Sequence, residues 1–274
     1  MRVHAAAAAA AAIAALAFAG CGGAPTHKGE PAQVQTGERS ARAPAVLRYP
    51  IDSRYAHRSL PQIAIAPPGV RRPPLLVFLH GKGGGPESNA NGAFLAALSD
   101  LGRRAPAVVF PDGGDHSYFH DRRDGAWDDY VMREAIPAAV RHLRADPGRV
   151  AIGGISMGGF GAFDIALHHP HRFCAVGGHS PAIWSSAAKA APGAFDDAAD
   201  FGRNDVIAMA RARRPARRLW IDSGDRDPFV PGARLLAAAL GIPKHTWSGG
   251  HDGAYWLAHY RDYLRFYASA LARC

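Results

Sequence analysis

Short apolar runs alternate with longer helix-compatible stretches along this chain from residue 45 onward. The run at 74–80, Pro-Leu-Leu-Val-Phe-Leu-His, has almost no polar position, which is typical of a strand covered on both faces. The pattern predicts strands at 45–50, 62–66, 74–80, 105–110, 149–153, 172–176, 218–222 and 244–247. It predicts helices at 87–101, 125–145, 160–168, 230–240 and 254–272. This alternation indicates an α/β fold, a doubly wound and mostly parallel sheet with helices on both faces.

Polar residues gather where these predicted strands end. In a doubly wound sheet, ligands bind beyond the carboxyl ends of the strands. We therefore expect the loops after residues 79, 110, 153, 176, 222 and 247 to surround one site.

The N-terminal 44 residues have a different pattern. Residues 5–19 form an alanine-rich apolar run, shorter than the about 20 residues that a membrane-spanning helix needs, and such a run is typical of a signal peptide. It ends in Phe-Ala-Gly-Cys21, which resembles a bacterial lipobox. We expect a signal peptide at 1–20, a lipid on Cys21, a polar tether at 21–44 and one domain at 45–274. Ordinary secretory cleavage beside an incidental cysteine is the alternative, so the protein is expected to be membrane-anchored by lipid or secreted.

Composition fits one soluble domain with a short tail. The chain has 274 residues, of which 48% are hydrophobic and 20% charged. The formal net charge is +9, almost entirely from arginines scattered along the chain in pairs. Because no basic stretch is interleaved with aromatic residues, we do not expect a nucleic-acid partner.

The three cysteines contain no C-x-x-C pair. A zinc ribbon or a dithiol redox site is therefore not indicated. Cys174 lies in an apolar run and fits a small core residue. The sequence leaves open whether it pairs with Cys274, although export would permit that disulfide.

The most informative motif is Gly-Ile-Ser-Met-Gly at 154–158, between a predicted strand and a predicted helix. Strand, G-x-S-x-G, helix is the pattern of a nucleophile elbow. Ser156 would sit at a strained turn, and glycines on either side would let strand and helix approach closely. The backbone N–H of Met157 would face a developing oxyanion. Since glycine is abundant, with 31 residues, an ordinary glycine-rich turn is the alternative.

A serine hydroxyl needs a base to take its proton and a carboxylate to orient that base. Asp227 follows the predicted strand at 218–222, and His251 follows the last predicted strand, so the order is Ser, Asp, His. Asp225 is the main competing acid and Asp222 a weaker one. Asp227 could instead cap the next helix.

Other polar residues have several interpretations. Three histidines at a predicted helix end, residues 168, 169 and 171, suit the helix dipole better than a metal site. His179 follows a strand and is expected to line the pocket. The loop after the strand at 74–80 is rich in glycine, and the N–H of Lys82 is the candidate second oxyanion donor. No P-loop motif is present, so a nucleotide site is weakly supported.

Several blocks resemble the putative-esterase family of esterase D-type, feruloyl-esterase-like and mycolyltransferase-like enzymes. The blocks are His80-Gly81, Trp127-x-x-Tyr130 through Glu134-x-Ile136-Pro137, the 154–159 elbow, Gly224-x-x-Asp227-Pro228-Phe229 and Gly250-His251-Asp252-x-x-x-Trp256. The resemblance runs from about residue 47 to the C-terminus. It implies an α/β-hydrolase fold and a serine hydrolase without cofactor, with Ser156 as nucleophile, Asp227 as acid and His251 as base.

Two segments are expected near the substrate. Residues 181–217 lie between two strands, include Trp184, and are interpreted as a lid or acyl-pocket wall; a surface excursion is the alternative. The loop at 115–124 brings Tyr118, and Trp127 follows it. We take these three aromatic residues and His179 as candidates for substrate contact.

The sequence thus predicts a serine carboxylic-ester hydrolase that works through an acyl-enzyme on a small-molecule ester. It implies neither cofactor nor metal. An acyltransferase using the same three residues is one alternative, and a non-catalytic cell-surface binding domain is another.

Overall fold

The computed structural model of the protein describes residues 44–274. The predicted signal peptide at 1–20, the lipidation at Cys21 and all but the last residue of the tether at 21–44 lie outside the described residues. Within 44–274, no helix combines the length and the apolar character needed to cross a bilayer.

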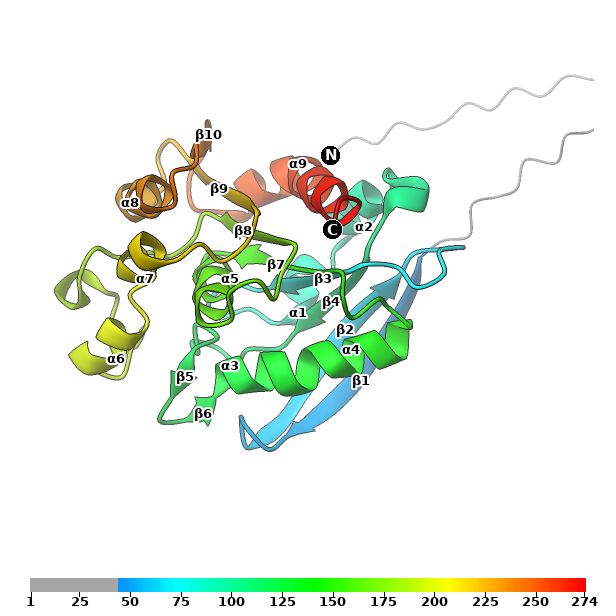
Figure 1. The fold of residues 1–274 in the computed structure, drawn as a ribbon, viewed down its shortest axis with the longest axis horizontal. Coiled ribbons are helices and arrows are strands. Elements are labelled where there is room, and N and C mark those ends of the chain that lie inside the picture. Colours follow the sequence, from blue (N-terminus) through cyan, green and yellow to red (C-terminus); the bar gives the residue numbers. More distant parts are fainter. Residues whose placement is uncertain (1–43) are drawn as a thin grey trace, which may run out of the picture. The chain divides into compact units, whose positions relative to one another are not determined.

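An eight-stranded sheet organises the described part of the chain (Figure 1). Its order is β1-β2-β4-β3-β7-β8-β9-β10, and all neighbours pair in parallel except β1 with β2 and β2 with β4. The strands are β1 (Ala45–Ser53), β2 (Arg58–Ala66), β3 (Leu75–Leu79), β4 (Ala107–Pro111), β7 (Val150–Ile155), β8 (Ala175–His179), β9 (Arg218–Gly224) and β10 (His245–Trp247). A separate hairpin joins β5 (Asp121–Arg122) and β6 (Gly125–Ala126). The predicted mostly parallel sheet is confirmed.

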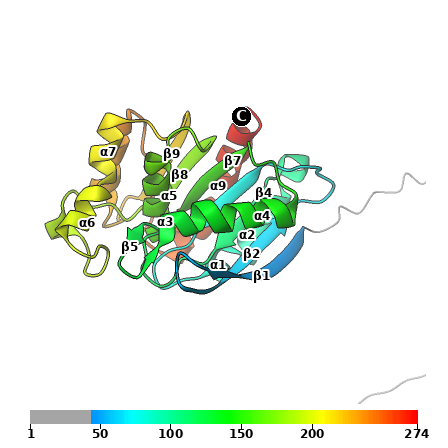
Figure 2. The same ribbon diagram turned by 60° about the horizontal axis from the view of Figure 1, so that its bottom comes forward.

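Helices cover both faces of this sheet (Figures 1 and 2). They are α1 (Pro86–Asn89), α2 (Gly92–Ser99), α3 (Trp127–Tyr130), α4 (Ile136–Leu143), α5 (Met157–His168), α6 (Ala198–Arg203), α7 (Val206–Ala212), α8 (Val230–Leu240) and α9 (Gly253–Leu271). Short 3-10 turns lie at Gly102–Arg104 and Ala187–Lys189. The apolar sides of α2 and α9 pack on one face, and α4, α5, α7 and α8 pack on the other. Every residue of the central strands β3, β4, β7 and β8 is buried, as their continuous apolar runs predict.

Three predicted helices differ from the observed ones, and the one expected at 160–168 begins earlier, at Met157. The helix expected at 87–101 is split into α1 and α2, because the Asn91 side chain accepts a hydrogen bond from the Phe94 N–H at 3.1 Å and starts a new helix. The helix expected at 125–145 begins only at Trp127, since the two residues before it pair in the β5–β6 hairpin. It then runs from α3 through a π-helical segment, Val131–Ala135, into α4.

Cys174 and Cys274 form a disulfide with a Cα–Cα distance of 5.7 Å. The bond joins the segment that enters β8 to the residues that follow α9. The sequence left this pairing open, because nothing in the local pattern shows that the end of the last helix returns to the start of β8.

Candidate active site

Ser156 occupies the sharp turn between β7 and α5. Its φ of 54° and ψ of −113° lie outside the regions that non-glycine residues normally adopt. The turn is held from both sides, because the Ser156 N–H donates to the His179 carbonyl at 3.0 Å and the Ser156 carbonyl accepts from the Phe160 and Ala182 N–H groups at 3.0 Å. The residue is 9% exposed. The strained backbone therefore presents the hydroxyl at the surface of the adjacent pocket.

The glycines of the motif are required because a larger side chain would clash with the backbone of neighbouring strands. A Cβ at Gly158 would lie 2.3 Å from the Leu79 carbonyl oxygen, and a Cβ at Gly154 would lie 2.6 Å from the same atom. Both distances are far inside van der Waals contact. Only glycine lets the end of β3, the end of β7 and the first turn of α5 meet this closely.

The structure brings Ser156, His251 and Asp227 together in one hydrogen-bonded row. The His251 Nε2 atom lies 2.8 Å from Ser156 Oγ, and His251 Nδ1 lies 2.9 Å from Asp227 Oδ2. Asp227 is 4% exposed, and its other oxygen accepts from the Phe229 N–H at 2.7 Å. Burial acts to raise the pKa of Asp227, but the hydrogen bonds from His251 and the Phe229 N–H hold it below its ordinary value. The carboxylate thus stays ionised and accepts a hydrogen bond from the Nδ1–H of His251, which leaves Nε2 free to accept from the serine.

The competing acids have other partners. Asp225 accepts from the Gly249 N–H at 2.9 Å and pairs with Arg226 at 3.4 Å at the surface. Asp222 is fully buried in β9, on the α9 side of the sheet, where it accepts from His179, Trp220, Tyr255 and Tyr263 at 2.7–3.0 Å. Asp227 also accepts from the N–H of Phe229, the residue before α8. The same side chain therefore caps the start of that helix and contacts His251.

Two backbone N–H groups next to Ser156 have no acceptor within the described 44–274 range. They belong to Met157, the first residue of α5, and to Lys82, in the loop after β3. That loop is fixed by the Gly83 N–H, which donates to the Asp115 carbonyl at 2.8 Å. It passes directly over the serine, because a Cβ at Gly81 would lie 3.6 Å from Ser156 Cβ. The Lys82 loop and the first turn of α5 thus both border the serine.

A pocket of about 770 Å³ opens in front of Ser156. Its walls come from the loop after β3, from α1, from the 115–124 loop and from the first turns of α9. They include Lys82, Ser88, Asn89, Asn91, Tyr118, Ala191, Phe229, Trp256, Leu257 and Tyr260. Asn89 Nδ2 and Trp256 Nε1 are buried donors that find no acceptor among the described residues. Asn89 and Tyr260 could not be recognised from the sequence, because they sit on helices and only the three-dimensional fold brings α1 beside α9, where the Tyr260 hydroxyl donates to Asn89 Oδ1 at 3.2 Å.

The four candidates for substrate contact have different positions. Tyr118 lines the pocket. Trp184 does not, but it packs edge-on behind Tyr118 and Phe229 with ring-centroid distances of 5.6 and 5.5 Å. Trp127 is 1% exposed, and its Nε1–H donates to Asp124 at 3.1 Å beneath the 115–124 loop.

The expectation that His179 lines the pocket is not met. His179 is the last residue of β8, it is fully buried, and its side chain points to the α9 face of the sheet. Its Nδ1 lies 2.7 Å from Asp222 Oδ2, and its Nε2 lies 3.0 Å from the Tyr267 hydroxyl. The strand periodicity directs the side chain away from the serine, although the His179 carbonyl oxygen supports the elbow.

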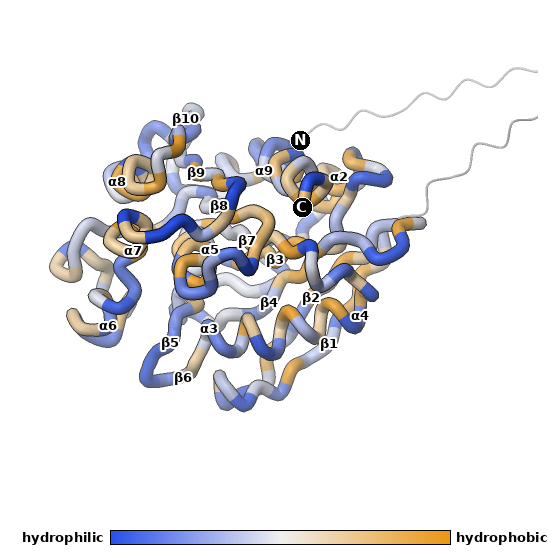
Figure 3. Tube along the Cα trace, in the orientation of Figure 1, coloured by the Kyte–Doolittle hydropathy of each residue, from blue (hydrophilic) through white to orange (hydrophobic). Residues whose placement is uncertain are grey.

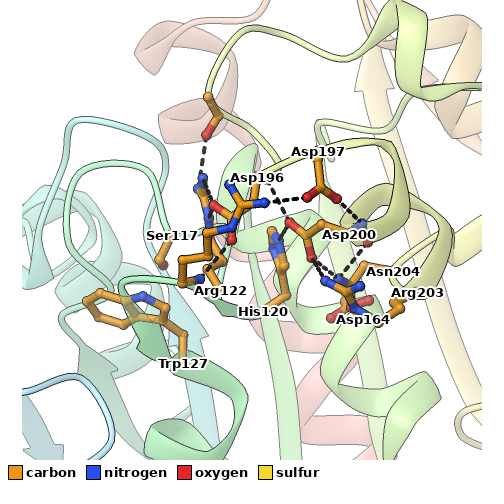
Figure 4. Close-up of polar contacts among 12 residues, drawn as sticks. Ser117, His120, Arg122, Trp127, Asp164, Asp196, Asp197, Asp200, Arg203 and Asn204 are labelled. Atoms are coloured by element: carbon orange, nitrogen blue, oxygen red, sulfur yellow. Dashed lines mark hydrogen bonds and ion pairs between the residues drawn. The ribbon is translucent and has the colours of Figure 1, made fainter.

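The 181–217 segment is fastened to the 115–124 loop (Figure 4). The Arg122 guanidinium lies 3.1 Å from Asp196 and donates to the Gly193 carbonyl at 2.9 Å. His120 Nε2 lies 3.1 Å from Asp200 Oδ2, and both residues are fully buried. These contacts join the segment to the wall that carries Tyr118.

Within residues 44–274, no group of three or more histidine, cysteine or acidic side chains is arranged to hold a metal ion. Of the helix-end histidines, His168 Nε2 lies 3.2 Å from Asn204 Oδ1, and His169 Nε2 lies 2.8 Å from Asp128 Oδ1.

The chain is similar in sequence and in fold to known proteins. The chain is 29% identical over 161 residues to the MPT51/MPB51 antigen of Mycobacterium tuberculosis, a match that covers 58% of this chain and 52% of the antigen. The matched region thus spans about half the length of that relative. An S-formylglutathione hydrolase from Agrobacterium tumefaciens superimposes with a TM-score of 0.73 at 20% identity, covering 84% of this chain and 96% of the other. A ferulic acid esterase superimposes with a TM-score of 0.72 at 20% identity, covering 83% and 98%.

These structural likenesses establish the α/β-hydrolase fold that the sequence predicts. The family model for putative esterases matches residues 59–262, which include the elbow and the segments that carry Asp227 and His251. The chain therefore belongs to the putative esterase family.

Proposed function

We propose that the protein is a serine carboxylic-ester hydrolase with Ser156 as nucleophile, His251 as general base and Asp227 as the orienting acid. One observation carries the proposal, the continuous hydrogen-bond row from Asp227 through His251 to Ser156 with distances of 2.9 and 2.8 Å. Membership of the esterase family supports hydrolysis as the reaction class.

In the proposed reaction, Ser156 Oγ attacks the ester carbonyl carbon as its proton passes to His251 Nε2. The Met157 and Lys82 N–H groups stabilise the resulting oxyanion. The tetrahedral intermediate collapses, the C–O bond to the alcohol breaks, and His251 gives its proton to the leaving oxygen. Water then attacks the acyl-enzyme by the same route and releases the acid.

The pocket suggests which esters are suitable. Tyr118, Phe229 and Trp256 offer apolar and aromatic surface, while Asn89 Nδ2 and Trp256 Nε1 are donors that need an acceptor. Leaving such donors unpaired is costly in a buried site. We therefore expect the best substrates to carry a carbonyl, hydroxyl or ether oxygen beside the apolar group, and a panel of alkanoyl, feruloyl and acetylated-sugar esters tests this.

A fluorophosphonate probe tests the nucleophile directly. The folded protein should be labelled, Ser156→Ala should abolish labelling, and Ser88→Ala, which changes another serine of the same pocket, should leave it intact. Absence of labelling in folded protein would favour the non-catalytic binding domain instead. Ester formation that requires an added alcohol would favour the acyltransferase.

We also propose that the protein is exported and lipid-anchored at Cys21. The alanine-rich leader and the Cys174–Cys274 disulfide, which suits an oxidising compartment, support export. Intact-mass measurement of membrane-extracted protein should show a lipidated N-terminal cysteine. A mature soluble form with unmodified Cys21 would contradict the anchor but not the export.

A further inference from the structure

Arginines gather at the amino ends of the parallel strands, opposite the end that carries Ser156. Arg172 precedes β8, Arg217 precedes β9, and Arg218 begins β9. They surround two adjoining hollows of about 560 and 480 Å³, which share Arg217, Arg218 and Arg273. We call the six arginines of these hollows the basic face: Arg172, Arg214, Arg217, Arg218, Arg265 and Arg273. Figure 3 shows the strongly hydrophilic connection from α7 to β9 that supplies two of them, Arg214 and Arg217.

Most of this charge is not neutralised by the protein. Of the six arginines, Arg265 alone has a carboxylate side chain within 4.0 Å in the described part of the chain, Asp262 at 3.8 Å. Arg214 donates to the Leu240 carbonyl and Arg273 to the Ser269 hydroxyl, which are neutral acceptors. Some arginines outside the basic face do pair with carboxylates in the described structure: Arg54, Arg72, Arg122, Arg123, Arg133, Arg203, Arg226 and Arg261.

Arg172 is partly buried without an anionic partner among the described residues. It is half-buried, its guanidinium lies over the Phe173 ring at 5.6 Å, and no carboxylate side chain pairs with it in the described structure. Burial lowers the pKa of Arg172, with no neighbouring charge acting in the other direction. Asp262 is the one acidic side chain among the described residues that line the two hollows, against six guanidinium groups and His171. An external anion would offset this excess.

The arrangement fits a plane of anions better than one small ion. The arginines are spread over two hollows, and three more, at positions 71, 103 and 104, precede the parallel strands β3 and β4 at the same end of the sheet. Half-buried apolar side chains, Leu219, Trp220 and Phe266, lie between the charged groups of the second hollow. Guanidinium groups bind phosphate oxygens in a bidentate manner, and an anionic bilayer presents many phosphates side by side above apolar chains.

We propose that the basic face docks on an anionic phospholipid surface, with lipid phosphates seated in its two hollows. Because the basic face lies at the amino ends of the parallel strands and Ser156 follows the carboxyl end of β7, docking in this way leaves the pocket open to solvent. The docking needs neither the lipid on Cys21 nor the hydrolytic activity.

Vesicle sedimentation with the full chain tests the proposal. The test variant is Arg217→Gln/Arg218→Gln, which keeps aliphatic and polar side chains at both positions and removes two exposed charges. The matched control is Arg48→Gln/Arg234→Gln, which removes two exposed charges outside the basic face. The parent protein and both double variants all contain Cys21→Ser, so that any contribution of the N-terminal segment to vesicle binding is the same in all three. Thermal unfolding confirms that each variant is folded.

We expect the parent protein to sediment with phosphatidylglycerol-containing vesicles and less with pure phosphatidylcholine vesicles. The Arg217→Gln/Arg218→Gln variant should partition about 30-fold more weakly, the equivalent of about 2 kcal/mol, because each arginine near such a surface contributes about 1 kcal/mol. Raising the salt from about 0.05 M to about 0.5 M should release the protein. The control variant should bind like the parent.

Three results would overturn the proposal. The first is equal binding by the two double variants, and the second is vesicle binding that ignores lipid charge and salt. The third is a loss confined to another anion: if Arg217→Gln/Arg218→Gln weakens binding of inorganic phosphate or of duplex DNA but not of vesicles, the basic face serves a free phosphate or a nucleic acid and not a membrane.

Discussion

Replacing Asp227 by asparagine should lower kcat by about 10³- to 10⁴-fold while leaving KM nearly unchanged. The Asp227 carboxylate lies 2.9 Å from His251 Nδ1 and is almost fully buried. When His251 takes the serine proton, the two charge centres are about 4 Å apart, and an effective dielectric constant of about 20 gives an attraction of about 4 kcal/mol. That energy corresponds to about a thousandfold in rate. An amide also offers an N–H to Nδ1, which favours the imidazole tautomer that cannot accept from Ser156, and such a change costs about 10⁴ in a Ser-His-Asp enzyme.

Asp225→Asn provides the matched control. Asp225 is two residues away, its side chain is 49% exposed, and it contacts the Gly249 N–H and Arg226 but not His251. An asparagine there keeps an acceptor for Gly249, so kcat should fall by less than about threefold. Both variants are compared on the p-nitrophenyl ester that the parent protein hydrolyses fastest, together with their rates of fluorophosphonate labelling. Equal losses in the two variants, or more than about a tenth of the parent kcat in Asp227→Asn, would refute the assigned roles.

Three further predictions concern stability. Gly158→Ala should destabilise the fold by about 3 kcal/mol or more, since the new Cβ would lie 2.3 Å from a backbone oxygen of β3; an unchanged urea midpoint would contradict this packing. Asp164, on α5, is fully buried, neither carboxylate oxygen has a hydrogen-bond partner in the described structure, and burial together with neighbouring carboxylates raises its pKa. Because a raised pKa means that folding stability falls as the pH rises above the unfolded value of about 3.9, Asp164→Asn should stabilise the protein at pH 7.5, with a gain that shrinks towards pH 4; a gain independent of pH would argue against it. Reduction of the Cys174–Cys274 disulfide, which closes a separation of 100 residues, should lower the free energy of unfolding by up to about 4.7 kcal/mol, and the double serine variant should unfold alike with and without reductant.

Local patterns predicted most of the fold. The strand at 74–80 and the elbow at 154–158 are recognisable because each depends on residues adjacent in the chain: a continuous apolar run in one case, and glycines around a serine in the other. The order of serine, acid and histidine singled out the three side chains that the structure brings together, because parallel strands deliver their following loops to one edge. The choice of Asp227 over Asp225 depended on which carboxylate points inward, and the structure shows that difference in the contacts of the two side chains.

Features that depend on distant contacts could not be predicted in this way. His179 ends a strand beside the elbow, and only the facing direction of its side chain, towards Tyr267 of α9, separates it from the pocket. The pairing of Cys174 with Cys274 depends on where the last helix ends. The break between α1 and α2 depends on one capping side chain, Asn91, inside a stretch whose composition otherwise suits a continuous helix.

The fastening of the 181–217 segment has a consequence for how this scaffold can diversify. Ala191 is the one residue of that segment among the pocket-lining residues described, whereas Asp196 and Asp200 hold the segment to Arg122 and His120. The residue of the 181–217 segment that lines the pocket is thus different from the residues that hold the segment in place. Exchanging the small side chain at 191 for larger ones offers a route to new selectivity, by natural drift or in the laboratory, that leaves the attachment points untouched.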